Sequence, residues 1–187
     1  MAYRHPHPPE KQAPHIALWM LRLLTSPSGL RQFVRKSGFG RDDIAYALGL
    51  DHWIDPEDRA FNPQAVRAEL YQRLDKSRHA CANAPLPALL QANVQRLAAL
   101  VGLNAVDARI LAFAVCLHNE PMLDDTADML DSLTTTQVIK AVAMLLELPE
   151  AQVRQALGSQ GLLARSGLVV IDRSGSGRLK SKLELLS

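Results

Sequence analysis

The sequence predicts a mostly α-helical protein, in which a helical N-terminal subdomain is followed by a winged helix-turn-helix with a small C-terminal β-ribbon. Three observations predict this fold class. Apolar residues recur at helical spacing over most of the chain. Aromatic residues make up only 5% of it, fewer than a β-sandwich needs. Beyond about residue 160, short β-branched stretches broken by glycine replace the helical pattern.

The chain divides into three predicted parts. Residues 1–14 are rich in proline and are expected to form a loose, polyproline-like arm. Residues 15–80 form a helical subdomain, and residues 81–187 form a helical and winged-helix domain. The boundary is placed within residues 75–85, where the helical periodicity is lost.

Four helices are predicted in the first subdomain. A serine or asparagine followed by proline marks two of the starts, because the first residue caps the helix and the second fits its first turn. Trp19 and Met20 are expected to pack into the core. The predicted helices are 15–25, a second from Ser26-Pro27 to Gly38 or Gly40, 42–48, and a fourth that begins at Asn62-Pro63 and buries Val66, Leu70 and Leu74.

A polar linker, residues 51–62, is predicted between the third and fourth helices, with a turn at Asp55-Pro56. Trp53, Ile54 and Phe61 are apolar exceptions in this segment. They either clip the linker onto the domain or form an exposed anchor for a partner, since aromatic residues are favoured at interfaces. The clip is the favoured interpretation.

Five helices are predicted in the second domain. Asn104 is predicted to cap one of these helices, with Asp107 at the third helical position. Thr134 and Gln137 have the spacing of a capping box, in which the cap and the third helical residue exchange hydrogen bonds. Gly102 is expected to end the first of these helices. The predicted helices are 86–101, 104–118, a short one opening at Asp124-Asp125, 134–146 and 151–157.

A winged helix-turn-helix is predicted from the order of the last elements. The turn at residues 147–150 leads into the second, recognition helix, and a ribbon follows it. Its predicted strands are Leu162–Arg165, Leu168–Asp172 and Leu179–Leu185.

The candidate contact residues lie on the recognition helix and the wing. They are Gln152, Arg154 and Gln155 on the helix, and Arg165, Arg173, Arg178, Lys180 and Lys182 on the wing. A DNA-reading helix needs several cations that bind phosphates, and this one carries a single arginine. Contact with a protein is therefore favoured, and weak, sequence-independent binding of nucleic acid is the alternative.

Motifs that resemble catalytic or metal sites have simpler interpretations. Asp124-Asp125-Thr126-Ala127-Asp128 matches a magnesium-binding pattern, but acidic residues are also favoured at a helix start. The glycine-rich segment 175–181 lacks the spacing of a phosphate-binding loop and is interpreted as the wing tip. His118 is expected to have a structural role at a helix C-terminus. The sequence offers no catalytic residues, no metal ligands and no cofactor site.

The composition excludes several classes of protein. The net charge of +2 is small for a dedicated nucleic-acid binder. No apolar run approaches the ~20 residues of a membrane helix, and the N-terminus lacks the apolar core of a signal peptide. Cys81 and Cys116 are the only cysteines and are expected to be reduced thiols. These features predict a cytoplasmic protein without membrane contact.

Residues 145–157, 161–168 and 179–187 resemble the region that precedes the ATPase module in a group of bacterial AAA-family ATPases. The helices from Leu86 onward agree in order, and residues 15–75 agree more faintly. The chain carries no Walker A motif, Walker B motif or arginine finger, so no ATPase residue is carried over.

The resemblance implies a non-catalytic N-terminal recognition or regulatory domain, which binds a protein partner or substrate for the motor. The ATPase module, with ATP and Mg²⁺, is then expected to begin after Ser187, and a homo-oligomeric parent is compatible with this family. A DNA-binding winged-helix transcriptional regulator is the alternative function.

Overall fold

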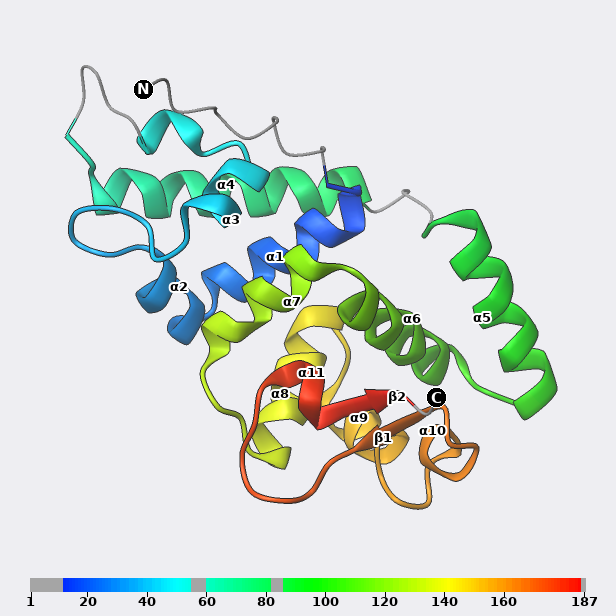
Figure 1. The fold of residues 1–187 in the computed structure, drawn as a ribbon. Helices are drawn as coiled ribbons and strands as arrows, with labels where there is room; N and C mark the ends of the chain where they lie inside the picture. The colour runs from blue at the N-terminus through cyan, green and yellow to red at the C-terminus, as the bar shows by residue number, and fades with distance from the viewer. Residues whose placement is uncertain (1–11, 55–59, 82–85, 186–187) are drawn as a thin grey trace, which may run out of the picture. The chain divides into compact units, whose positions relative to one another are not determined.

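The computed structural model describes residues 12–54, 60–81 and 86–185 (Figure 1). The chain is mostly helical and has one small antiparallel sheet near its C-terminus, which confirms the coarse fold class. It forms two compact units, Met1–Ala82 and Asn83–Ser187. None of the helices in the described ranges combines the length and apolar character that a membrane crossing needs.

The first unit is built on α1, which packs against α2 and α4. Trp19 and Met20 of α1 are buried in its core, as predicted. The caps also agree with the sequence, since the Ser26 side chain accepts a hydrogen bond from the Gly29 amide and Asn62 accepts from the start of α4. The elements are α1 (Pro14–Thr25), α2 (Pro27–Phe33), α3 (Asp42–Ala47), the 3-10 turn η1 (Asp51–Trp53) and α4 (Pro63–Cys81).

Two helix ends in the first unit differ from the prediction. α2 ends at Phe33, well before Gly38, because Val34 and Phe39 pair across a tight hairpin. α4 continues to Cys81, although periodicity is lost near residue 75. Its last turns are exposed, so they carry no apolar stripe from which the helix could be recognised. The turn predicted at Asp55-Pro56 lies outside the described residues.

The second unit begins with a series of helices. The predicted cap at Asn104 is present and forms a full capping box with Asp107, and the predicted capping box of Thr134 with Gln137 is present as well. Gly102 closes the first helix in a left-handed conformation, with φ of 81°. The elements are α5 (Ala88–Val101), α6 (Ala105–Asn119), α7 (Pro121–Ala127), the 3-10 turn η2 (Asp128–Leu130), α8 (Thr135–Leu146) and α9 (Glu150–Ala156).

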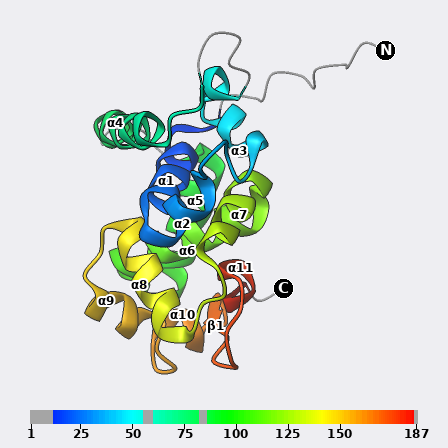
Figure 2. The same ribbon diagram turned by 90° about the vertical axis from the view of Figure 1, so that its left-hand side faces the viewer.

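The helices α8 and α9 lie side by side and are joined by a short turn (Figure 2). Glu147 ends α8 in a left-handed conformation, with φ of 48°. Beyond α9 the chain turns sharply at Gly161, where a Cβ atom would lie 2.2 Å from the Ala156 carbonyl oxygen. Only glycine fits this corner.

The C-terminal segment is a mixture of helix and strand rather than the predicted ribbon. β1 (Val169–Ile171) lies within the predicted second strand and pairs antiparallel with β2 (Leu183–Leu185), with Val170 opposite Glu184. The predicted strand Leu162–Arg165 is instead the short helix α10. The first half of the predicted third strand is also helical, as α11 (Leu179–Lys182).

Burial of Lys182 explains the second of these errors. Leu179, Lys182 and Leu183 are all buried, which is helical spacing. A lysine is assumed to be exposed when hydrophobicity is read along a sequence, so the segment seemed to alternate like a strand.

Candidate functional site

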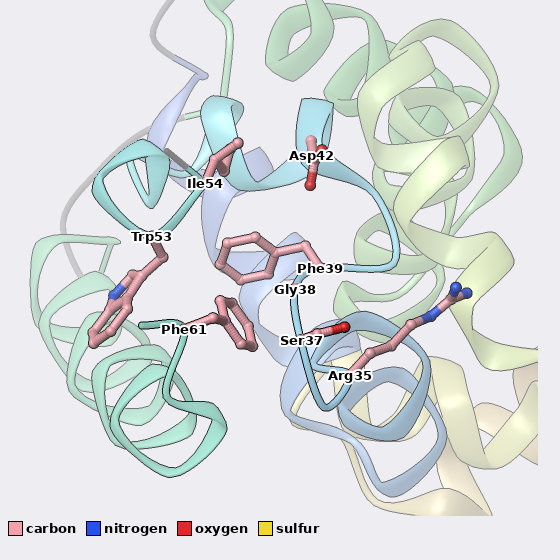
Figure 3. A pocket seen from close by; sticks show the side chains of 8 residues that line it. All are labelled: Arg35, Ser37, Gly38, Phe39, Asp42, Trp53, Ile54 and Phe61. Carbon is pink, nitrogen blue, oxygen red and sulfur yellow. The ribbon is translucent and has the colours of Figure 1, made fainter. Parts of the chain in front are cut away.

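Three aromatic side chains from separate segments of the first unit come together beside the hairpin that follows α2. Phe39 lies on the hairpin, Trp53 ends η1, and Phe61 precedes α4 (Figure 3). The ring centroids of Phe39 and Phe61 are 5.2 Å apart, and those of Trp53 and Phe61 are 6.4 Å apart. Both pairs meet edge to face, an arrangement that aromatic rings favour.

These rings line a hollow of about 340 Å³. Phe39 and Phe61 are half-buried, whereas Trp53 is only 7% exposed. The guanidinium of Arg35 points away from the rings, and Asp42 lies at the opposite rim (Figure 3). The burial of Trp53 agrees with the clip interpretation of this segment. The lining residues are Arg35, Ser37, Gly38, Phe39, Asp42, Trp53, Ile54 and Phe61.

Glu69 of α4 holds the Trp53 side of this hollow in place. Its carboxylate accepts hydrogen bonds from the Trp53 indole at 2.8 Å, from Arg73 at 2.6 Å and from His52 at 3.0 Å. Burial alone would raise the pKa of Glu69, but these hydrogen bonds and the Arg73 charge outweigh it and lower the pKa. Glu69 was not predicted from the sequence, where its only signal is its spacing of four residues from Arg73.

The predicted recognition residues of α9 are all exposed. Gln152 and Gln155 make no side-chain hydrogen bond with the described residues. Arg154 forms an ion pair of 2.6 Å with Glu150, one turn earlier on the same helix. The exposed face of α9 therefore offers amide groups, with its single cation already next to a carboxylate.

The five predicted wing residues divide into two groups. Arg165 and Arg173 are exposed and have no ion pair within the described residues. The other three lie next to carboxylates of the same unit. The pairs are Arg178 with Asp128 at 3.1 Å, Lys180 with Asp124 at 2.8 Å, and Lys182 with Asp172 at 3.4 Å.

Lys182 is fully buried, so its ammonium group is not on the surface that a partner meets. It donates to the carbonyl oxygens of Ser174 at 2.8 Å and Gly175 at 3.3 Å, besides Asp172. Hydrogen bonds from Ser174 to Asp172, helped by Lys182, hold the pKa of that carboxyl below its ordinary value. The lysine thus fixes the loop between β1 and α11 from inside.

The acidic motif of α7 has a clear role in these contacts. Asp124 binds Lys180, and Asp128 binds Arg178. The two carboxylates are four positions apart, and the two basic residues are two positions apart on the C-terminal segment. The motif that resembled a magnesium site therefore joins α7 and η2 to Arg178 and α11. Within the described ranges, no three His, Cys, Asp or Glu side chains are grouped as metal ligands would be.

A second hollow, of about 560 Å³, lies next to these ion pairs. His118 borders it, and its Nε2–H donates to the Leu183 carbonyl at 2.6 Å, which joins α6 to β2. This contact fits the structural role predicted for His118. The hollow carries both signs of charge, so it does not favour an anion or a cation. Its lining residues are His118, Asp124, Arg178, Lys180, Ser181, Glu184 and Leu185.

The two cysteines are free thiols. Burial, reinforced by the Glu120 carboxylate, raises the pKa of Cys116 to about 11. Burial also raises the pKa of Cys81, against the opposing charge of Arg22. Neither environment produces the thiolate that a nucleophilic cysteine needs.

Comparison of the chain with protein-family models gives no match. No curated protein matches the chain. No solved structure matches it either. The arrangement of side chains is therefore the basis for the functional inference.

Proposed function

We propose that the second unit is a non-catalytic recognition domain that binds a protein partner through α9 and its neighbouring turns. The proposed architecture is a winged helix, with α8 and α9 as the helix-turn-helix and β1 and β2 as the wing. The isolated bridge between Leu133 and Gly177 supports it, because it adds a third extended segment before α8.

The pairing of basic side chains with the unit's own carboxylates is the observation that carries this proposal. DNA-binding surfaces gain affinity when free lysines and arginines displace counterions from phosphates. Arg154, Arg178 and Lys180 lie against carboxylates, and Lys182 is buried. These carboxylates lower the positive potential that the surface presents to phosphates, so we expect its binding to nucleic acid to be weak.

The exposed amides of Gln152 and Gln155 suit a protein partner instead. A neutral amide donates and accepts hydrogen bonds without the desolvation cost of a charge, which fits a polar protein interface. The resemblance to the region before an AAA-family ATPase module extends the proposal, with the partner being a substrate or regulator of that motor. A Walker A motif in the coding sequence that follows residue 187 is expected on this view.

Duplex binding measured by fluorescence anisotropy at low and physiological salt tests the proposal. We expect weak binding that is independent of sequence and disappears at physiological salt. Nanomolar affinity for one sequence, lost in Gln152→Ala, would overturn it. Partner capture from the source cells should fall in a Gln152→Ala/Gln155→Ala variant and persist in a Lys140→Ala variant, which changes an exposed residue of α8.

Arg165 and Arg173 favour a second candidate function, which is DNA binding as a regulator. Both are exposed and unpaired within the described residues, and both flank the proposed wing. If DNA binding is the function, Arg165→Ala/Arg173→Ala should weaken it on every sequence and reduce its salt dependence by about two phosphate contacts.

A further inference from the structure

Helix α5 carries the two most exposed large apolar side chains of the described residues. Leu89 is 75% exposed and Leu100 is 83% exposed, although both belong to a regular helix. α5 packs against α6, and Val94 is its only buried residue. Two such side chains on one regular helix make α5 the candidate surface for contact with another chain among the described residues.

The residues on this face of α5 are spaced symmetrically. Leu89, Asn93, Arg96 and Leu100 follow one another at intervals of four, three and four positions. At about 100° per residue, these intervals place all four within roughly 60° of one another around the helix axis. The face therefore has a leucine at each end and two polar residues between them.

The side chains of the two polar residues are available for contact with another molecule. Asn93 and Arg96 are exposed and make no hydrogen bond or ion pair with the described residues. Arg96 is also the only charged residue of α5. A surface that pairs with this face must therefore cover two leucines and offer an acceptor to the guanidinium.

We propose that this surface is a second copy of the same chain, bound through an antiparallel pair of α5 helices around a twofold axis. In that arrangement Leu89 contacts Leu100 of the second copy, and Arg96 lies beside Asn93 of the second copy. Each contact occurs twice, as a twofold axis requires. The asparagine amide oxygen accepts from the guanidinium, so both polar residues are satisfied.

The spacing favours this occupant over others. A parallel pair would place Arg96 against Arg96 of the second copy, which repel each other. Read in reverse, the order leucine, asparagine, arginine, leucine pairs each leucine with a leucine and each asparagine with an arginine. The face is therefore complementary to a reversed copy of itself. The 3-4 spacing is also that of the positions at which the helices of a coiled coil meet.

The size of the face sets the strength of the dimer. Two helices of this length bury less than the roughly 1,200 Å² at which stable interfaces begin. We therefore expect a reversible dimer, with a dissociation constant in the micromolar range or weaker. Its dissociation is followed by analytical ultracentrifugation of the full chain over a range of concentrations.

Substitutions on α5 test the surface. Leu89→Glu/Leu100→Glu should give a monomer at every concentration, because it places carboxylates opposite each other. Tyr71→Glu is the matched control, since Tyr71 is 50% exposed on α4 and should leave the dimer unchanged. Circular dichroism verifies that each variant is folded. A wild-type chain that stays monomeric up to millimolar concentration overturns the proposal.

Charge substitutions at the centre of the face test the orientation. Asn93→Asp places a carboxylate beside Arg96 of the second copy and should lower the dissociation constant several-fold. Asn93→Lys places two cations together and should raise it by at least as much. Equal effects of the two substitutions would exclude the proposed contact.

Cysteine cross-linking gives a second test of orientation. In a Cys81→Ser background, chains with Leu89→Cys are mixed with chains that carry Leu100→Cys. A disulfide requires Cα atoms within about 7 Å, whereas two copies of position 89 lie about 16 Å apart in an antiparallel pair. The mixture should therefore form a covalent dimer faster than either chain alone. Equal cross-linking by the Leu89→Cys chain alone would overturn the antiparallel arrangement.

Discussion

The indole Nε1–H of Trp53 donates a hydrogen bond of 2.8 Å to Oε2 of Glu69, a residue sixteen positions further along the chain. The contact joins η1 to α4 and fixes the Trp53 side of the aromatic hollow. It also explains why an apolar residue stands in a polar linker. Trp53 packs onto the first unit, and the acidic residue of α4 orients its ring.

Trp53→Ala should destabilise the first unit by about 3 kcal/mol, because it removes a buried ring and leaves a cavity. Trp53→Phe retains most of the packing but loses the hydrogen bond, so a loss of about 1–2 kcal/mol is expected. Urea denaturation followed by circular dichroism measures both. Wild-type stability in the alanine variant would contradict the clip.

Glu69→Gln should reduce stability by about 1–3 kcal/mol at neutral pH, because the charged acceptor of three donors becomes neutral. The folded pKa of Glu69 lies below its ordinary value, so the carboxylate stabilises the fold fully above that ordinary value. As pH falls, the unfolded chain takes up the proton first, and the advantage of the wild type declines until the folded carboxyl is also protonated. Urea titrations from pH 7 to pH 3 should show the two proteins converging, and a constant difference would contradict this role.

His15 should make the fold sensitive to mild acid. It is 8% exposed, packs edge to face on Trp19, and neither ring nitrogen has a hydrogen-bond partner in the described residues. Burial lowers the pKa of His15, so below about pH 6.5 the unfolded chain binds a proton that the folded chain does not. Stability should fall by up to ~1.4 kcal/mol per pH unit until the folded imidazole is also protonated.

The variant His15→Phe should lack this component of the pH dependence between pH 7 and pH 5. His79→Gln removes an exposed histidine of α4 and serves as the control for loss of one imidazole. Parallel stability curves for wild type and His15→Phe would contradict this, because they would mean that the imidazole has the same pKa in the folded and unfolded chains.

Lys182→Met should destabilise the second unit by about 2–4 kcal/mol. It removes the buried ammonium group and leaves the carbonyl groups of Ser174 and Gly175 and the carboxylate of Asp172 without their donor. Lys180→Met is the control, since the Lys180 side chain is 35% exposed and its ion pair should contribute under about 1 kcal/mol. Thermal unfolding compares the two. Equal losses of stability in the two variants would mean that the buried Lys182 contributes no more to stability than the partly exposed Lys180.

Local signals in the sequence predicted much of the helical part of the fold. The capping boxes at Asn104 and Thr134 depend on residues three positions apart, so they could be recognised directly. The two serine- or asparagine-proline starts are equally local. The C-terminal segment could not be predicted in this way, because whether Lys182 is buried depends on a loop that only the folded chain assembles.

The ion pairs of the candidate contact residues could not be predicted from local signals either. Their positions on α9 and near the sheet followed from the order of elements, but their ionic partners did not. Asp124 and Lys180 are 56 positions apart, and no local pattern connects them. A charge counted from sequence is therefore an upper limit on the charge that the surface presents to a partner.

The contacts that close the second unit differ widely in their separation along the chain. His118 and Leu183 are separated by 65 positions, whereas α5 and α6, or α8 and α9, are neighbours along the chain. Closing a short loop costs less entropy, so we expect the helical hairpins to form before the C-terminal strand docks. We also expect the C-terminal segment to be the first to detach in transient opening. Detachment together with α11 would expose Asp124 and Asp128 to water while the helices remain folded.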